Sequence, residues 1–310
     1  MVEREDLELP RGIALAWGVA ANPQRGPKRE MSVEQIVEAA VEIADAEGLG
    51  AVSMAAVAAR LGYTPMSLYR YVSAKDDLIL LMQEEATGLP SEAVRTAGDW
   101  RAMLTQLYRE QVQLYLQHPW VLDVPISGSP ATPNSAAWMD AGLAALDGTP
   151  LTHDERLSVL LLVTGAARWA GIILAGYARR ERSSGEALEE IAQNEDSLYR
   201  ALITEDAYPH LRAAIEAGVF LDESDPFTFG LERSLDGVQA YMDRVAEGRR
   251  PERLPWMGLD DADIAADKRY REARKAVRAA EKALRDARRL ERQVAREARE
   301  RAAAAVRKAE

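Results

Sequence analysis

Apolar residues recur at helical spacing in every periodic segment between residues 32 and 247 of this 310-residue chain. No run of alternating apolar and polar residues bounded by hairpin turns is present, so strands are not expected. The sequence therefore predicts an all-α fold. The predicted helices cover residues 32–48, 53–61, 65–72, 73–88, 99–117, 134–146, 153–182, 185–204, 209–217 and 226–247.

Glycine, proline and charge divide the chain into five parts. Residues 1–30 are predicted to be a flexible extension that ends in a basic arm, and residues 31–90 a small helical domain. Residues 91–247 are a larger helical domain, followed by a linker at 248–267 that contains prolines and an acidic cluster. Residues 268–310 contain no Gly or Pro and thirteen Ala, which predicts a charged helical tail.

The net charge of −11 is unevenly spread along the chain. The tail holds 16 Lys and Arg against 7 Asp and Glu, whereas the preceding 267 residues hold 23 against 43. An argument for nucleic-acid binding must therefore rest on a local surface rather than on the isoelectric point. The acidic N-terminus lacks an apolar run, so no secretory signal is expected and a cytoplasmic location is predicted.

Neither a metal centre nor an enzyme is expected. The chain has no Cys, and His118, His153 and His210 do not lie at metal-ligand spacing. No nucleophile elbow, phosphate-binding loop or dinucleotide motif is present, so no cofactor is predicted.

One apolar segment, residues 157–178, is long enough to cross a bilayer. Arg168 lies near its centre, where a charge would be costly in lipid, and several Gly and Thr residues interrupt the apolar run. A helix within a soluble bundle is the preferred interpretation, and no membrane partner is expected.

Two short helices joined by a tight turn are predicted near the N-terminus. Ser53 caps the first helix, Gly62 ends it, and Thr64 with Pro65 begins the second. Two helices joined in this way fit a helix-turn-helix, whose second helix enters the major groove of DNA.

The second of these helices has two different faces. Leu68 and Val72 lie four residues apart and can pack together on the preceding helix. Met66 and Arg70 then point in the opposite direction, with Ser67 and the two tyrosines at the flanks. The outward face therefore carries a guanidinium group, hydroxyl groups and one thioether.

The segment from residue 53 to residue 75 contains three basic residues and no acidic one, and DNA requires such local positive charge. Arg70 can make a bidentate contact with guanine, whereas Ser53, Tyr69 and Lys75 suit phosphate contacts. Equally, the tyrosines could be aromatic residues at the rim of a core, because a capped helix pair is common in all-α proteins.

Several short motifs lie within residues 32–88. They are Ala-Glu-Gly at 46–48, Val52-Ser53, Val57-Ala58, Leu61-Gly62, the run Leu68-Tyr69-Arg70-Tyr71-Val72, and Lys75-Asp76 leading to Leu78. Through them the segment resembles the N-terminal DNA-binding domain of the tetracycline-repressor (TetR/AcrR) family. The resemblance implies base or groove contacts from Thr64, Pro65, Met66, Ser67 and Arg70. It implies contacts with the DNA backbone from Ser53, Tyr69, Tyr71 and Lys75.

The chain also departs from the family pattern at one place. Many members carry an arginine in the second helix where this chain has Ala55. We hypothesise that the basic arm supplies the missing contact through Arg25, Lys28 and Arg29. Outside the domain, residues 11–18 resemble an N-terminal extension of a family subgroup, and His118-Pro119-Trp120 resembles the start of the C-terminal regulatory domain.

The resemblance implies a homodimer that binds a palindromic operator on double-stranded DNA. The predicted dimer helices are 153–182 and 226–247, although the first could instead be an internal core helix of a monomer. A small-molecule effector in the C-terminal bundle would act through residues 74–88, the helix that follows the recognition helix. The predicted function is therefore a repressor that an effector releases from DNA.

Candidates for the effector pocket are aromatic or unusual polar residues on apolar faces, each of which could equally belong to a core or an interface. They are Met103, Tyr108, Tyr115, Trp120, Trp138, Met139, Arg168, Trp169 and Tyr177. A charge among Leu and Ile residues needs a partner, which for Arg168 could be Asp140, Asp147, an acid of the second subunit or an anionic ligand. A salt bridge is preferred over a ligand.

Three interpretations of the tail are open: a solvated charged helix, an arm that contacts phosphates, and a self-association helix with an alanine-rich heptad pattern. Two rival functions follow for the whole chain. One is a sequence-tolerant protein that coats DNA, which only the tail favours, and the other is an enzyme.

Overall fold

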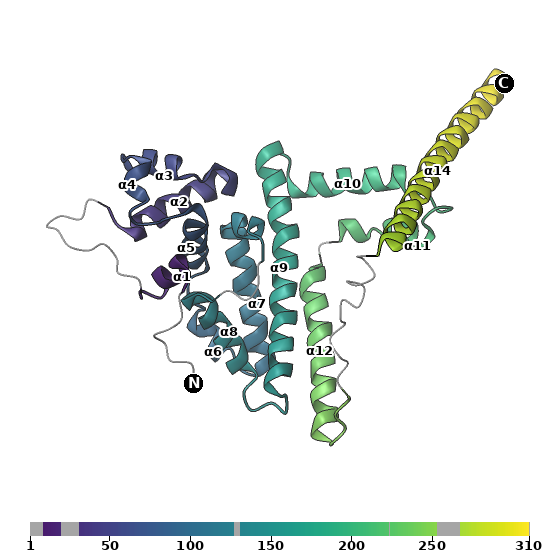
Figure 1. Cartoon of the computed structure of the whole chain (residues 1–310). Helices are drawn as coiled ribbons and strands as arrows, with labels where there is room; N and C mark the ends of the chain where they lie inside the picture. The colour runs from purple at the N-terminus through teal and green to yellow at the C-terminus, as the bar shows by residue number, and fades with distance from the viewer. Residues whose placement is uncertain (1–8, 20–30, 127–130, 223, 253–266, 310) are drawn as a thin grey trace. The chain divides into compact units, whose positions relative to one another are not determined.

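The computed structural model describes residues 9–19, 31–126, 131–222, 224–252 and 267–309, and every regular element within these ranges is a helix (Figure 1). The prediction of an all-α fold is confirmed. The chain separates into two compact units, Met1–Arg249 and Arg250–Glu310. Each unit is described by itself below.

The N-terminal part of the first unit contains α2 (Val33–Glu47), α3 (Met54–Leu61), α4 (Pro65–Leu68) and α5 (Lys75–Thr87), with a 3₁₀ turn, η2 (Leu49–Ala51), after α2. A capping box begins α2, because Ser32 Oγ accepts a hydrogen bond from Gln35 N at 3.2 Å and Gln35 Oε1 accepts one from Ser32 N at 3.1 Å. Helix α2 packs on α3 and α5, and α3 packs on α4. Ile36, Val57 and Leu78 are fully buried between them.

A second core lies in the C-terminal bundle of the same unit. It is built from α6 (Glu92–Thr96), α7 (Trp100–Gln117), α8 (Pro133–Ala145), α9 (His153–Ser184) and α12 (Pro226–Ala246). Thr152 caps the start of α9, with Glu155 N donating to Thr152 Oγ1 at 3.4 Å. Leu107, Val163 and Leu235 are fully buried where α7, α9 and α12 meet.

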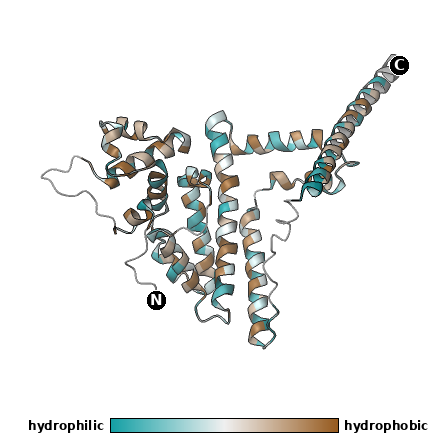
Figure 2. Ribbon diagram, viewed as in Figure 1, coloured by the Kyte–Doolittle hydropathy of each residue, from teal (hydrophilic) through white to brown (hydrophobic). Residues whose placement is uncertain are grey.

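Helix α9 is the longest element of the first unit, and its length and composition would allow it to cross a membrane. It packs on α7, α8 and α12, yet only 33% of its most apolar 18-residue window is buried. Leu161, Trp169 and Ile172 are exposed by 61%, 59% and 42%. Apolar residues recur along α9 (Figure 2), and part of them lie on a face that the described residues of the first unit leave exposed.

Beyond α9 the chain forms a smaller helical group. Gly185 ends α9 with a φ of 73°, and α10 (Leu188–Leu202), α11 (Pro209–Glu216) and the 3₁₀ turn η4 (Val219–Leu221) follow. These three elements pack on one another, and α10 also contacts α9.

The structure differs from the predicted helices at four places. The third helix ends at Leu68 and continues as turns, so it is shorter than the predicted 65–72. The fourth predicted helix, 73–88, begins two residues later, because α5 starts at Lys75 after Ala74. Two short helices were not predicted, since α6 and α1 (Arg11–Ala16) are too brief to show periodicity.

Helix α1 lies in the N-terminal extension that the sequence predicts to be flexible. It packs against α5, and Gly12 N donates a hydrogen bond to Asp77 Oδ1 at 3.0 Å. A Cβ atom on Gly12 would lie 2.9 Å from this oxygen, so only glycine allows the close approach. The extension is therefore folded at residues 11–16.

The second unit contains one long helix, α14 (Lys268–Ala309), in the predicted charged tail (Figure 1). Of the preceding linker, residues 253–266 lie outside the described ranges.

Candidate nucleic-acid interface

Helices α3 and α4 form the predicted helix-turn-helix. Ser53 Oγ accepts a hydrogen bond from Ala56 N at 3.1 Å and so caps α3. Gly62 ends α3 in the left-handed region with a φ of 77°, and Tyr63 N donates to Ala58 O at 2.8 Å. This turn, residues 62–64, joins α3 to α4, and the two helices pack against each other.

Helix α4 has the two faces that its sequence predicts. Leu68 and Val72 are fully buried against the N-terminal core. Met66 is 76% exposed, and Arg70 is exposed beside it. The outward direction of Met66 and Arg70 leaves a thioether and a guanidinium group free to reach a partner.

The other predicted contact residues lie around this face and differ in how far their side chains are exposed. Thr64, Pro65, Tyr69 and Lys75 are exposed, whereas Ser67 and Tyr71 are half-buried. Thr64 Oγ1 and Ser67 Oγ are hydrogen-bonded to each other at 2.9 Å, so Thr64 does not cap a backbone amide of α4 with its side chain. Tyr71 packs against the N-terminal core, as the core-rim interpretation predicts. Arg25, Lys28 and Arg29 lie outside the described residues.

The positive charge of this surface is smaller than the sequence suggests. Arg60 Nε donates to Glu42 Oε2 of α2 at 2.9 Å, so a carboxylate compensates one of the three predicted cations. Arg70 and Lys75 form no ion pair with any described residue. The sequence window from 53 to 75 missed Glu42 because the two partners are 18 residues apart.

Three polar contacts join the helix-turn-helix part to the C-terminal bundle. Asp45 Oδ1 at the end of α2 accepts a hydrogen bond from Trp120 Nε1 at 2.7 Å and lies 2.8 Å from His118 Nδ1. Glu84 of α5 accepts from the backbone and side chain of Asn134 at 2.6 and 2.8 Å. The indole of Trp138 donates to the carbonyl oxygen of Gly88, at the end of α5, at 3.0 Å. The contacts of Glu84 and of Trp138 both connect α5 with α8. Helix α8 therefore holds α5, the helix that follows the helix-turn-helix, directly.

The predicted effector-pocket residues do not gather in one site. Trp120 is buried in the N-terminal core, and Trp138 is buried under α5. Tyr177 OH donates to Glu195 Oε2 at 2.8 Å, and Trp169 is exposed on α9. The remaining aromatic and methionine candidates belong to the second core or pack against it: Met103, Tyr108, Tyr115 and Met139.

Of the partners predicted for Arg168, Asp140 and Asp147 are wrong, whereas an acid of the second subunit or an anionic ligand stays a prediction. Asp140 and Asp147 lie 3.1 Å from Arg95 and Arg156, which they pair with instead. Arg168 Nη2 donates to the carbonyl oxygens of Leu122 and Val124, at the end of the 3₁₀ turn η3 (Pro119–Asp123), at 2.8 and 3.2 Å. Carbonyl groups at the end of a helical turn carry partial negative charge, so they compensate the guanidinium without a carboxylate.

Tyr115 lies beside Arg168 in this buried region. Burial raises the pKa of the Tyr115 hydroxyl, although the Arg168 guanidinium acts in the opposite direction. The ring of Tyr115 also fills the space that a side chain at Gly171 would need, because a Cβ there would lie 2.7 Å from the ring. The pair therefore joins α7, α9 and η3.

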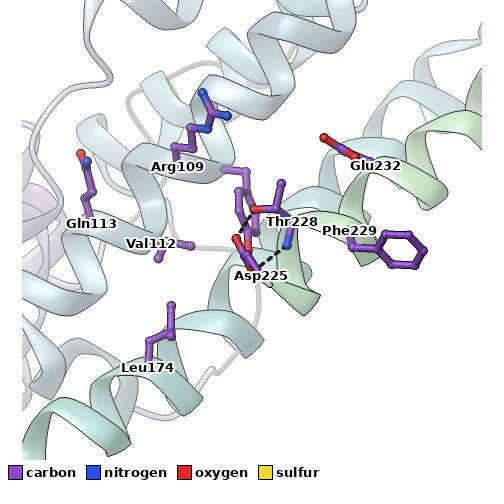
Figure 3. Close-up of a pocket in the computed structure, with 9 residues that line it drawn as sticks. Arg109, Val112, Gln113, Leu174, Asp225, Thr228, Phe229 and Glu232 are labelled. Carbon is purple, nitrogen blue, oxygen red and sulfur yellow. Dashed lines mark hydrogen bonds between the residues drawn. The ribbon is translucent and has the colours of Figure 1, made fainter. Parts of the chain in front are cut away.

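An open groove of about 540 Å³ lies elsewhere, between α7, α9 and the start of α12 (Figure 3). Of the predicted pocket residues, only Tyr108 lines it. The other lining residues were not predicted: Arg109, Val112, Gln113, Leu174, Asp225, Thr228, Phe229 and Glu232.

Charge near the groove is set by Asp225, which caps α12. Although burial opposes it, hydrogen bonds from Thr228 and Phe227 hold the pKa of Asp225 below its usual range. Burial and the neighbouring Asp225 raise the pKa of Tyr108. Among the described residues no group of three or more His, Asp or Glu side chains could hold a metal ion.

Known families match both parts of the first unit. Residues 36–82 match the family of bacterial regulatory proteins named for tetR, and residues 93–242 match the tetracyclin repressor-like C-terminal domain. Among solved structures, apo ActR from Streptomyces coelicolor aligns with a TM-score of 0.54 and 22% identity, over 71% of this chain and 100% of ActR. ActR in complex with actinorhodin aligns with a TM-score of 0.53 and 20% identity, over 69% and 96%. These two likenesses establish the fold.

Relatives by sequence carry regulator names. The HTH-type transcriptional repressor DrrR1 of Streptomyces coeruleorubidus is 36% identical over 250 residues, which cover 80% of this chain and 90% of DrrR1. The HTH-type transcriptional repressor Rv1353c of Mycobacterium tuberculosis is 25% identical over 69% of this chain and 82% of its own length. The helix-turn-helix geometry and these matches agree, and the chain belongs to the tetracycline-repressor family of DNA-binding transcriptional regulators.

Proposed function

We propose that the chain is a cytoplasmic dimeric repressor that binds a palindromic operator and leaves it when a small-molecule effector binds. The observation that carries this proposal is the exposure of Met66 on α4 and of Arg70 in the turn that follows it, opposite the buried Leu68 and Val72. A recognition helix needs this combination, because it must be fixed to the core on one side and free on the other.

Each exposed group on this surface suits a particular DNA contact. The free guanidinium of Arg70 can bind the O6 and N7 atoms of guanine, and Met66 can contact a thymine methyl group. Tyr69 and Lys75, both exposed, suit phosphate oxygens, which set the register of the protein on the duplex. Ser53 is occupied as a cap, so the free amides at the start of α3 are the better phosphate donors there.

The uncovered apolar face of α9 supports dimerisation. Leu161, Trp169 and Ile172 are exposed on this face, and Gly165 between them leaves open space for a close approach. Apolar residues at this density on one helix mark an interaction surface. A two-fold axis across α9 would pair the face with itself and present two recognition helices to two half-sites.

The groove beside α7 and α12 is our candidate for the effector site. It combines apolar walls at Val112 and Leu174 with polar groups at Tyr108 and Gln113, as ligand sites do. An effector that prefers a different packing of the bundle would shift α8, and the Glu84 and Trp138 contacts would carry the shift to α5. The spacing of the two recognition helices would then no longer match one DNA turn.

The test is selection of bound duplexes from a random pool, followed by a screen for metabolites that release the bound DNA. We expect a palindrome whose half-site centres are about 34–36 Å apart. Recovery of sequences without a shared motif, or protection of a single half-site by a monomer, would refute the proposed function.

A further inference from the structure

The long helix α14 lies beyond the residues that match the family, which end at residue 242. It is a helix of 42 residues, about 63 Å long at about 1.5 Å per residue. The proposed function assigns it no role. Its basic residues nevertheless recur at a regular spacing, which a helix that serves only as a solvated spacer does not require.

Basic residues of α14 repeat at heptad spacing in two series. The first series is Arg271, Arg278, Arg285, Arg292 and Arg299, and the second is Lys275, Lys282, Arg289 and Arg296. The second series is offset from the first by four residues, so the helical repeat places all nine positions on one face. We call these nine residues the basic stripe. They extend over 29 residues, or about 42 Å of helix.

No acidic residue interrupts the basic stripe at either heptad position. The acidic residues of the tail occupy other positions, at 272, 281, 286, 291, 297, 300 and 310. Alternating charges would be typical of a solvated helix stabilised by its own ion pairs. Acidic residues three or four positions away, such as Glu281 and Asp286, can compensate part of the stripe, but the tail keeps 16 basic against 7 acidic residues, and this excess of positive charge favours an anionic partner.

The opposite side of α14 favours an anionic partner over a helical one. Val277 and Leu284 are exposed by 56% and 52%, but of the heptad positions that alternate with them only the last, Val294, is larger than Ala, since residues 273, 280 and 287 are all Ala. An alanine-rich pattern buries little apolar area, so it gives a weak coiled coil and a shallow membrane anchor. The strongest chemical signal of the helix is its row of positive charge.

The first unit has little positive charge with which to attract DNA, and the basic stripe would add such charge. Among the described residues, its candidate DNA surface offers Arg70 and Lys75 as cations without an ion pair, because Glu42 compensates Arg60. The residues before the tail hold 23 basic against 43 acidic groups, so most of the chain repels DNA. We propose that α14 is a second DNA-binding element, whose basic stripe binds the phosphate backbone of duplex DNA without reading its sequence. The proposal rests on the proposed function in one respect, that duplex DNA is the partner.

The test compares two full-length variants that lose the same number of charges. In the stripe variant, Arg271, Arg278, Arg285, Arg292 and Arg299 are changed to Gln, which keeps helix propensity high. In the matched control, Arg269, Arg274, Arg288, Arg301 and Lys308, which lie outside the stripe, are changed to Gln. Circular dichroism checks that both variants keep their helix content. The readout is the affinity for a 40-base-pair duplex of random sequence at several salt concentrations.

We expect the stripe variant to lose about 4 to 5 units from the slope of log K against log salt, since each of the five phosphate contacts removed contributes about 0.9. Its affinity should fall roughly 10- to 100-fold at 0.1 M salt, and the control should lose much less. Equal losses in both variants would refute the stripe and leave only a net-charge effect. An unchanged slope would overturn the proposal. Binding of the tail to phosphatidylserine vesicles, or a higher oligomeric mass in its presence, would then identify a different partner.

This result can be separated from the proposed function. If operator selection finds no shared motif but the stripe variant still loses its slope on random DNA, the proposed function fails and α14 remains a DNA-binding element. If a palindrome is found and the slope does not change, the proposed function stands and the role of α14 in DNA binding fails.

Discussion

Helices α4 and α14 are both proposed to bind DNA, yet different physics holds each of them in place. Helix α4 is four residues long and depends on the buried side chains beneath it. Helix α14 is 42 residues long, lies outside both cores and forms through the propensity of its Ala, Arg and Glu residues. Helix α4 is therefore held rigidly enough to contact particular bases. Helix α14 suits contacts with phosphates, which need positive charge but no exact position.

The largest expected effect concerns the core under α4. Leu68→Ala removes a fully buried side chain and should lower the free energy of unfolding by about 2–5 kcal/mol. Leu284→Ala in α14, where the side chain is 52% exposed, should change it by less than about 0.5 kcal/mol. Urea denaturation of the full chain measures both. Similar losses would contradict the contrast between a packed and a self-supporting helix.

The next effect concerns the exposed face of α9. Trp169→Glu places a charge in the proposed dimer interface and should weaken dimerisation by about 2 kcal/mol or more, roughly 30-fold. Leu284→Glu introduces the same charge in α14 and should leave the dimer intact. Analytical ultracentrifugation at a series of concentrations distinguishes them. A Trp169→Glu protein that stays dimeric would place the interface elsewhere.

A smaller effect separates base reading from phosphate binding. Arg70→Ala should cost about 1–3 kcal/mol on the selected operator and little on random duplex. A single change in the basic stripe, Arg278→Gln, should weaken both duplexes equally and lower the salt slope by about 0.9. Fluorescence anisotropy gives the four affinities. An equal loss on both duplexes for Arg70→Ala would end its proposed role as a base reader.

The smallest effect is the pH dependence of the cap at α12. The pKa of Asp225 is lowered in the folded protein, so its contribution to stability is full above the unfolded pKa of about 4 and is lost as the pH falls through the lower folded value. Asp225→Asn should therefore be less stable than the unchanged chain at pH 7, and the difference should shrink towards pH 3. A difference that stays constant with pH would show that the ionised carboxylate does not matter. Urea midpoints at both pH values measure it.

Local patterns in the sequence were sufficient for most of the helices. Capping residues and glycines gave the bounds of α2 and α3, because caps act within three or four residues. Helical spacing also identified the buried side of α4, since Leu68 and Val72 are fully buried. Helices of five and six residues, α6 and α1, were missed because they contain fewer than two turns.

Contacts between distant residues were not predictable in the same way. The partners of Arg168 are carbonyl oxygens, which every residue has, so no sequence pattern could mark Leu122 and Val124. The groove lining was missed for a similar reason, because it brings α7, α9 and α12 together from well-separated segments. A pocket predicted from unusual residue types collected mainly core aromatics instead.

The sequence by itself determined the all-α fold, the capped helix pair, the outward face of α4 and the charge of the tail. These features follow from interactions within one or two helical turns, which spacing and residue type encode directly. The tertiary structure alone decided that Glu42 neutralises Arg60, that Asp45 holds Trp120, and that one face of α9 stays uncovered. Such contacts join residues 18 to 75 positions apart, so they depend on how whole helices pack against each other rather than on any local pattern.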